Sequence, residues 1–92
     1  MTVEEFEASD GSAFSGALLA LWWDAKGDWE KAHEVAQDVS GRDGAWVHAY
    51  LHRKEGDLGN AGYWYRQAGR PVVSGEFRVE WEGIVREMLS AG

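Results

Sequence analysis

The sequence predicts an all-α protein made of two antiparallel helical hairpins, stacked in a repeat-like bundle, and a C-terminal amphipathic capping helix. Three observations lead to this fold class. Two similar hexads, GDWEKA at residues 27–32 and GDLGNA at residues 56–61, each follow a stretch of apolar and aromatic residues. Apolar residues recur at intervals of three and four on both sides of each hexad, which is the period of an α-helix. The only proline, Pro71, separates the second hairpin from the last predicted helix.

Each hexad is interpreted as the turn of one hairpin. Gly27 and Gly56 can end a helix in the left-handed conformation, which is free of strain only without a Cβ atom. Asp28 and Asp57 can then cap the following helix, because a side-chain carboxylate accepts an otherwise unpaired backbone N–H of the first turn. The pattern in both halves is therefore helix, tight turn, helix.

One helical domain is expected over residues 1–92, with at most five helices. Its expected parts are a flexible acidic N-terminus or short helical turn at 1–11, the first hairpin at 12–41, the second hairpin at 44–70 and the capping helix at 75–90. The helix that starts near Ser12 is apolar on nearly all sides, which predicts a central position. The capping helix is expected to cover the open end of the second hairpin, because stacked hairpins otherwise leave an apolar face exposed.

Composition narrows the classes of function. Sixteen acidic against nine basic side chains give a net charge of −7, which makes nucleic acid and anionic membrane surfaces unfavourable partners. The longest nearly continuous apolar run, residues 13–23, is far shorter than the roughly 20 residues that a membrane-spanning helix needs. Acidic residues precede it, unlike a cationic secretory leader, so a cytoplasmic location is expected. The absence of cysteine excludes disulfides and thiolate metal sites, and no cofactor is expected.

The hairpin pattern resembles the tetratricopeptide family, whose repeat has a small residue and an aromatic residue in its first helix and an alanine in its second. The residues that carry the resemblance are Leu19, Ala20, Trp23 and Ala32 in the first unit, and Ala49, Ala61, Tyr65 and Ala68 in the second, whereas Ala36 stands where the family usually has an aromatic residue. The resemblance covers roughly residues 12–70, and both units are shorter than the family's repeat of about 34 residues. A general likeness to small bacterial proteins of unknown function implies no activity.

The resemblance implies a groove and a noncatalytic function as a protein or peptide interaction module, or as a self-associating subunit. In the family's register the groove is lined by two sets of residues, Phe14, Ala17, Leu21 and Asp24 from the first unit and Trp46, Tyr50, Arg53 and Lys54 from the second. Two adjacent cations beside two aromatic rings suit a peptide carboxylate or an acidic side chain. An alternative interpretation is that Arg53 and Lys54 are the basic last turn of a helix, placed there by the helix dipole. The expected partner is a protein or peptide, with homo-oligomers as a further alternative.

A second candidate site consists of His48, His52 and Glu55, which would make the protein a small metal-binding or histidine-dependent enzyme. At i, i+4 and i+7 these side chains lie within about 60° of one another around a helix. Two imidazoles one turn apart can share a Zn²⁺ ion, and a carboxylate can complete three ligands. The alternative is that both are ordinary histidines packed between helices. The third histidine, His33, is expected on a different helix.

The run Tyr63, Trp64 and Tyr65 spreads over about 200° of a helix, so its rings cannot all face one core. Either some of the rings form an exposed binding surface, or neighbouring helices cover them on two sides.

Overall fold

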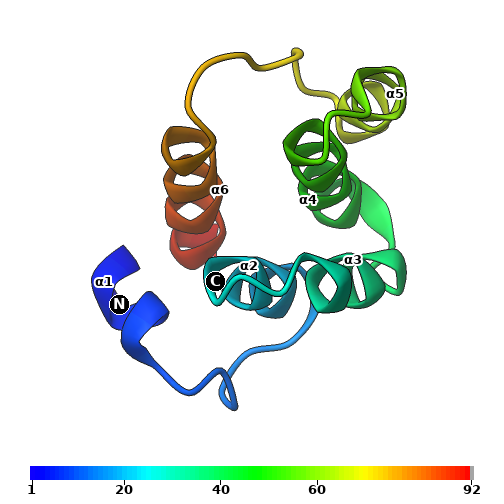
Figure 1. Ribbon diagram of the computed structural model, residues 1–92. Coiled ribbons are helices and arrows are strands. Elements are labelled where there is room, and N and C mark those ends of the chain that lie inside the picture. Colours follow the sequence, from blue (N-terminus) through cyan, green and yellow to red (C-terminus); the bar gives the residue numbers. More distant parts are fainter. Residues whose placement is uncertain (92) are drawn as a thin grey trace.

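The computed structural model describes residues 1–91, so only Gly92 of the expected domain lies outside the described residues. The described chain contains six α-helices and no strand. They are α1 (Val3–Ala8), α2 (Gly16–Ala25), α3 (Trp29–Gln37), α4 (Gly41–Lys54), α5 (Leu58–Ala68) and α6 (Phe77–Ala91). Helix α2 packs against α3, and α4 packs against α5 (Figure 1). The all-α class, the two hairpins and the C-terminal helix are thus confirmed.

The two Gly-Asp pairs form the turns of the hairpins. Gly27 and Gly56 have φ angles of 85° and 90°, which residues with a Cβ atom rarely adopt. The N–H groups of Asp28 and Asp57 bond back to carbonyls in the last turn of the preceding helix. Both aspartate side chains accept a hydrogen bond from the backbone N–H three residues later, at 2.9 Å and 3.3 Å. The same local chemistry therefore ends one helix and starts the next in both hairpins.

The N-terminal segment forms a helix of its own, which is why the structure has six helices where at most five were expected. Thr2 and Glu5 make a capping box at its start, in which each side chain bonds the other's backbone N–H. Phe6 is fully buried, and its ring meets Phe14 edge to face with centroids 4.8 Å apart. Of the two alternatives for residues 1–11, the structure has the helical turn, because an apolar anchor docks it on the core.

The hydrophobic core takes buried residues from all six helices. Its largest fully buried side chains are Trp81, Tyr50, Tyr65, Phe6, Leu21, Leu51, Ile84, Val47 and Val85. Helix α2 packs against α1, α3, α4 and α6, so it is central, as its apolar composition predicts. Helix α4 is equally central, since it packs against α2, α3, α5 and α6. It is also the more buried of the two, because residues 44–51 are buried without interruption.

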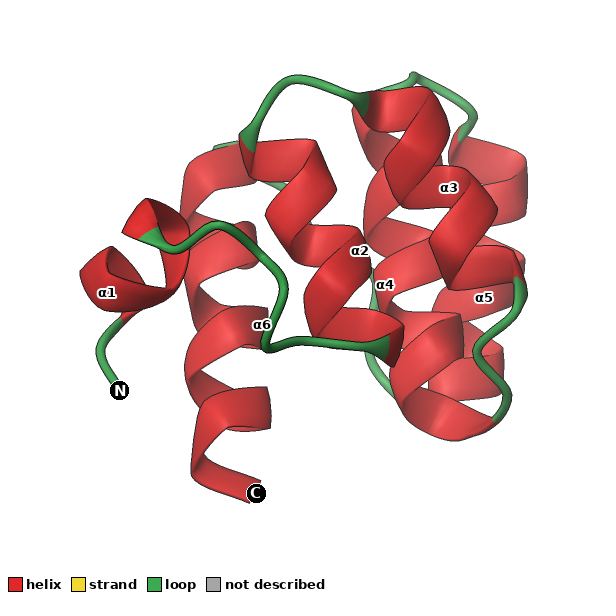
Figure 2. Cartoon of the chain, turned by 90° about the horizontal axis from the view of Figure 1, so that it is seen from below, coloured by secondary structure: helices red, strands yellow, loops and turns green. Residues whose placement is uncertain are grey.

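Helix α6 lies in a different place from the expected one. It packs against α1, α2 and α4, whereas α5, the outer helix of the second hairpin, lies on the other side of α4 (Figures 1 and 2). The indole N–H of Trp81 donates to the carbonyl of Leu21 at 2.9 Å, which fastens α6 to α2. Within residues 1–91, none of the helices combines the length and the apolar character that crossing a bilayer requires.

Candidate metal centre

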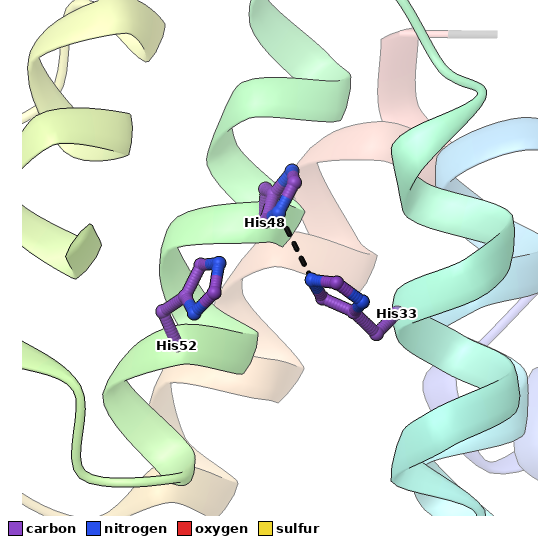
Figure 3. Close-up of side chains that lie close together, drawn as sticks. All are labelled: His33, His48 and His52. Atoms are coloured by element: carbon purple, nitrogen blue, oxygen red, sulfur yellow. Dashed lines mark hydrogen bonds between the residues drawn. The ribbon is translucent and has the colours of Figure 1, made fainter.

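The chain's three histidines converge where α3 meets α4. His33 comes from α3, and His48 and His52 come from α4 (Figure 3). The Nε2 atoms of His33 and His48 are 3.1 Å apart. One ring nitrogen from each histidine lies within 4.8 Å of those of the other two. The cluster therefore lies between the first and the second hairpin, and it consists of side chains of a type that can ligate metals.

Helical spacing and two tryptophans hold the rings in place. His48 and His52 are one turn apart on α4, so they share one face of that helix. Trp29 stacks on His33 with centroids 4.9 Å apart, and Trp64 from α5 stacks on His48 at 4.2 Å. The stacked tryptophans restrict the tilt of both imidazoles. Trp64 is thus the member of the Tyr63–Tyr65 run that contributes to this cluster.

Glu55 defines which nitrogen of His52 is free. Its Oε1 lies 2.6 Å from His52 Nδ1. An ionised carboxylate can only accept a hydrogen bond, so Nδ1 carries a proton, and in the neutral form of the ring Nε2 then holds the lone pair. A histidine that binds a metal through one ring nitrogen usually donates a hydrogen bond from the other nitrogen to a carboxylate or another acceptor, which fixes the orientation of the ring. In this arrangement Glu55 positions His52, and His33 offers the third nitrogen of the cluster.

Histidines must be uncharged to bind a metal, and the surroundings of His33 and His48 favour the uncharged form. Burial is the main cause that lowers the pKa of His48 to about 4, and the neighbouring His52 and His33 contribute to the same shift. Burial also lowers the pKa of His33, with His52 as the second cause. Since His33 and His48 face each other through Nε2, one of these two nitrogens donates the proton of the hydrogen bond between them. A bound cation would take the place of that proton.

The spacing of the nitrogens suits a small divalent ion. Zinc bonds histidine nitrogen at about 2.0 to 2.1 Å in tetrahedral geometry, which places two ligand nitrogens about 3.3 Å apart. The observed 3.1 Å between His33 and His48 is close to that value. The third nitrogen, from His52, lies within 4.8 Å of the other two. The His52 ring is stacked nearly parallel on that of His48, at an interplanar angle of 13°, so it has to turn about its side-chain bonds to direct its nitrogen at the same ion. Imidazole donors favour zinc, copper, nickel and iron over the harder magnesium and calcium.

The sequence pointed to His48, His52 and Glu55 but set His33 apart because it lies on another helix. The structure brings His33 into the cluster because the second helix of the first hairpin packs against the first helix of the second hairpin. The signal in the sequence was the position of His33 one turn after Trp29, near the middle of α3. His52, Glu55 and Asp57 form another group of potential ligands within 4.8 Å, but its carboxylates are exposed.

The residues expected to bind a peptide have partners within the chain. Tyr50 and Lys54 donate to Asp24 at 2.6 Å and 2.9 Å, linking α4 to α2. Arg53 Nε donates to Glu80 Oε1 at 2.9 Å, linking α4 to α6. Trp46 is buried, and its ring lies under the guanidinium group of Arg70, which follows the end of α5. Because α4 is central, these side chains point toward other helices, and the peptide-binding role stays a prediction.

Comparison with protein-family models, with curated proteins and with solved structures found no match to this chain. The resemblance to tetratricopeptide repeats therefore stays a prediction, and function has to be inferred from the geometry of the histidine cluster.

Proposed function

We propose that this protein binds a divalent first-row transition metal ion, with Zn²⁺ as the main candidate, through His33, His48 and His52. The observation that supports this proposal is the convergence of three imidazoles from two helices, with two Nε2 atoms 3.1 Å apart. Glu55 supports it as the carboxylate that orients His52. This function is the metal-binding alternative of the sequence analysis, with His33 as a ligand in place of Glu55.

The ion would connect the two hairpins. His33 belongs to the first hairpin and His48 to the second, so a metal that binds both ties α3 to α4. An ion that binds only the folded chain stabilises it in proportion to the logarithm of its concentration, by about 2.7 kcal/mol at 100 times the dissociation constant. Three protein ligands leave a fourth tetrahedral position for water, as in catalytic zinc sites. A metal-bound water in that fourth position is the group that hydrolytic zinc enzymes use, so the three-histidine site also suits a hydrolytic reaction.

The test is a Zn²⁺ titration of protein purified without a histidine tag, in competition with a chromophoric chelator. We expect one ion per chain. The variant to test is His33→Phe, because His33 is the ligand that comes from a different helix than the other two. Phenylalanine keeps a ring that stacks on Trp29. Loss of a carboxylate behind a metal ligand weakens binding about 10- to 100-fold, so loss of a ligand itself should weaken it by about 100-fold or more.

Glu34→Gln is the matched control, because Glu34 is next to His33 but its side chain is 70% exposed. This variant should bind Zn²⁺ like the parent protein. Equal affinity of the parent and His33→Phe would show that zinc binds at the exposed His52, Glu55 and Asp57 instead, and it would refute the proposal.

A further inference from the structure

An open pocket of about 330 Å³ lies away from the histidines, where the start of α5 faces the segment that joins α5 to α6. Its apolar lining consists of Leu58, Ala61, Val72 and Val73, and we call it the α5 pocket. Leu58 and Val72 are each 68% exposed, although both are large and aliphatic. Exposed apolar side chains that gather around a pocket are typical of a surface that binds another molecule.

The wall of the pocket opposite α5 is a stretch of backbone with free hydrogen-bonding groups. Residues 70–74 form no helix, turn or bend, and Figure 1 shows them in the yellow to orange loop between α5 and α6. The N–H and C=O groups of Val72, Val73 and Ser74 make no hydrogen bond to another backbone group within residues 1–91. An extended peptide can pair with such a stretch through its own backbone, while a neighbouring pocket takes one of its side chains.

The polar groups of the lining are already paired within the chain. Arg53 Nε donates to Glu80 Oε1, and the hydroxyl of Tyr65 donates to the other oxygen of Glu80. The charge of Arg53 is therefore balanced by Glu80. The occupant is selected by apolar contact instead, and the aliphatic lining favours an aliphatic side chain.

Charge decides between a second copy of this chain and a different partner. The exposed Asp57 directly precedes Leu58. The exposed Glu76 directly follows Gly75, which lines the pocket. The cation of α5 is the exposed Arg66, about two turns beyond Leu58. The surroundings are thus negative on balance, like the whole chain with its net charge of −7, which opposes a second copy and attracts a basic peptide.

We propose that the α5 pocket is the docking site of an extended basic peptide. One aliphatic side chain of the peptide enters the pocket, and its backbone pairs with residues 72–74. Lysine or arginine side chains on either side of the aliphatic residue then face the acidic surroundings. The docking site is independent of the metal site, because none of the three histidines lines the pocket. The contact is small, so a dissociation constant on the order of 1 mM is expected.

The probe is the peptide acetyl-KVLVK-amide, titrated without added metal into ¹³C-methyl-labelled protein and followed by NMR. Saturable shifts of the Leu58, Val72 and Val73 methyl groups are expected. Acetyl-KVAVK-amide, which lacks the leucine side chain, should bind at least about tenfold more weakly. The same loss is expected for acetyl-KVLVK-amide with N-methylated valines, whose backbone cannot pair.

A charge-reversed peptide tests the preference for a basic partner. Acetyl-EVLVE-amide should bind at least about fivefold more weakly than acetyl-KVLVK-amide at low ionic strength. The difference should become smaller in about 0.5 M salt, because salt screens the interaction between exposed charges.

Two variants at exposed positions test the location. Leu58→Ser removes one apolar wall and should weaken binding of acetyl-KVLVK-amide about tenfold. Val79→Ser is the matched control, because Val79 is 66% exposed but lies on α6 outside the pocket, and this variant should bind like the parent.

The proposal is overturned if acetyl-KVLVK-amide gives no saturable shifts up to about 10 mM, which is well above the expected dissociation constant. Equal binding of the alanine, N-methylated or glutamate peptide overturns it too, as does unchanged binding by Leu58→Ser. Sedimentation tests the remaining occupant: a dimer of the parent that Leu58→Ser converts to a monomer would mean that a second copy fills the pocket instead of a basic peptide.

Discussion

His33 and His48 are 15 residues apart in the sequence and belong to different hairpins, yet their Nε2 atoms are 3.1 Å apart. The contact exists because α3 packs against α4, and Trp29 and Trp64 stack on His33 and His48. With His52 one turn further along α4, one nitrogen of each of the three histidines lies within 4.8 Å of those of the other two. This geometry is the basis of the metal proposal.

The hydrogen bond from His52 to Glu55 predicts a supporting role for that carboxylate. Glu55→Ala should weaken Zn²⁺ binding about 10- to 100-fold, because His52 loses the group that fixes its tautomer and orientation. One ion per chain should still bind. A chelator competition titration measures both values, and unchanged affinity would mean that Glu55 does not position His52.

The buried pair of Arg53 and Glu80 should matter far more to stability than the exposed pair of Arg70 and Glu87. Glu80→Gln leaves the buried guanidinium without a counter-charge and should lower the free energy of unfolding by about 3 kcal/mol. Glu87→Gln removes an exposed charge and should lower it by less than about 1 kcal/mol. Urea denaturation distinguishes the two, and equal losses would contradict the burial of the first pair.

The hairpin turns depend on glycines with positive φ angles. Gly27→Ala and Gly56→Ala should each lower the free energy of unfolding by about 1 kcal/mol, because a Cβ atom strains the left-handed conformation. Gly83→Ala, within α6, should raise it by about 0.5 to 1 kcal/mol. A Cβ atom would meet no other atom within 4 Å at any of these positions. Thermal unfolding would contradict this account if all three variants changed stability in the same direction.

The buried tyrosines make the protein sensitive to alkali. Burial raises the pKa of Tyr50 and of Tyr65, and the hydrogen bonds to Asp24 and Glu80 raise both further. In the unfolded chain a tyrosine titrates near pH 10, so the unfolded state releases protons that the folded state retains. Stability is therefore fully present below about pH 10 and decreases above it, by up to about 1.4 kcal/mol per pH unit for each hydroxyl.

Urea denaturation between pH 9 and pH 11 measures this loss. Tyr50→Phe has no hydroxyl at that position, so its stability should fall less steeply with pH than that of the parent. Identical slopes would show that Tyr50 ionises as readily in the folded chain as in the unfolded chain.

Local chemistry explains which parts of the fold could be predicted from the sequence. The turns at Gly27 and Gly56 were predictable because a positive φ angle and an aspartate cap involve only adjacent residues. His48 and His52 were recognisable as a pair because their spacing alone puts them on one helix face.

The tertiary contacts were not predictable in this way. The place of His33 depends on the angle and register between α3 and α4, which no local pattern encodes. The same holds for Arg53, whose partner Glu80 lies 27 residues later on α6. The groove at Arg53 was expected from the register of the tetratricopeptide family, which does not say which side chains lie next to Arg53 in this chain. The short α1 helix likewise depends on Phe6 docking on the core.

The most direct test of the metal proposal is an NMR titration of the ¹⁵N-labelled imidazoles with Zn²⁺. The account predicts that the Nε2 signals of His33, His48 and His52 all move to metal-bound positions and stop moving at one equivalent of zinc. If only His52 responds, or if the shifts continue beyond one equivalent, the three histidines do not share one ion.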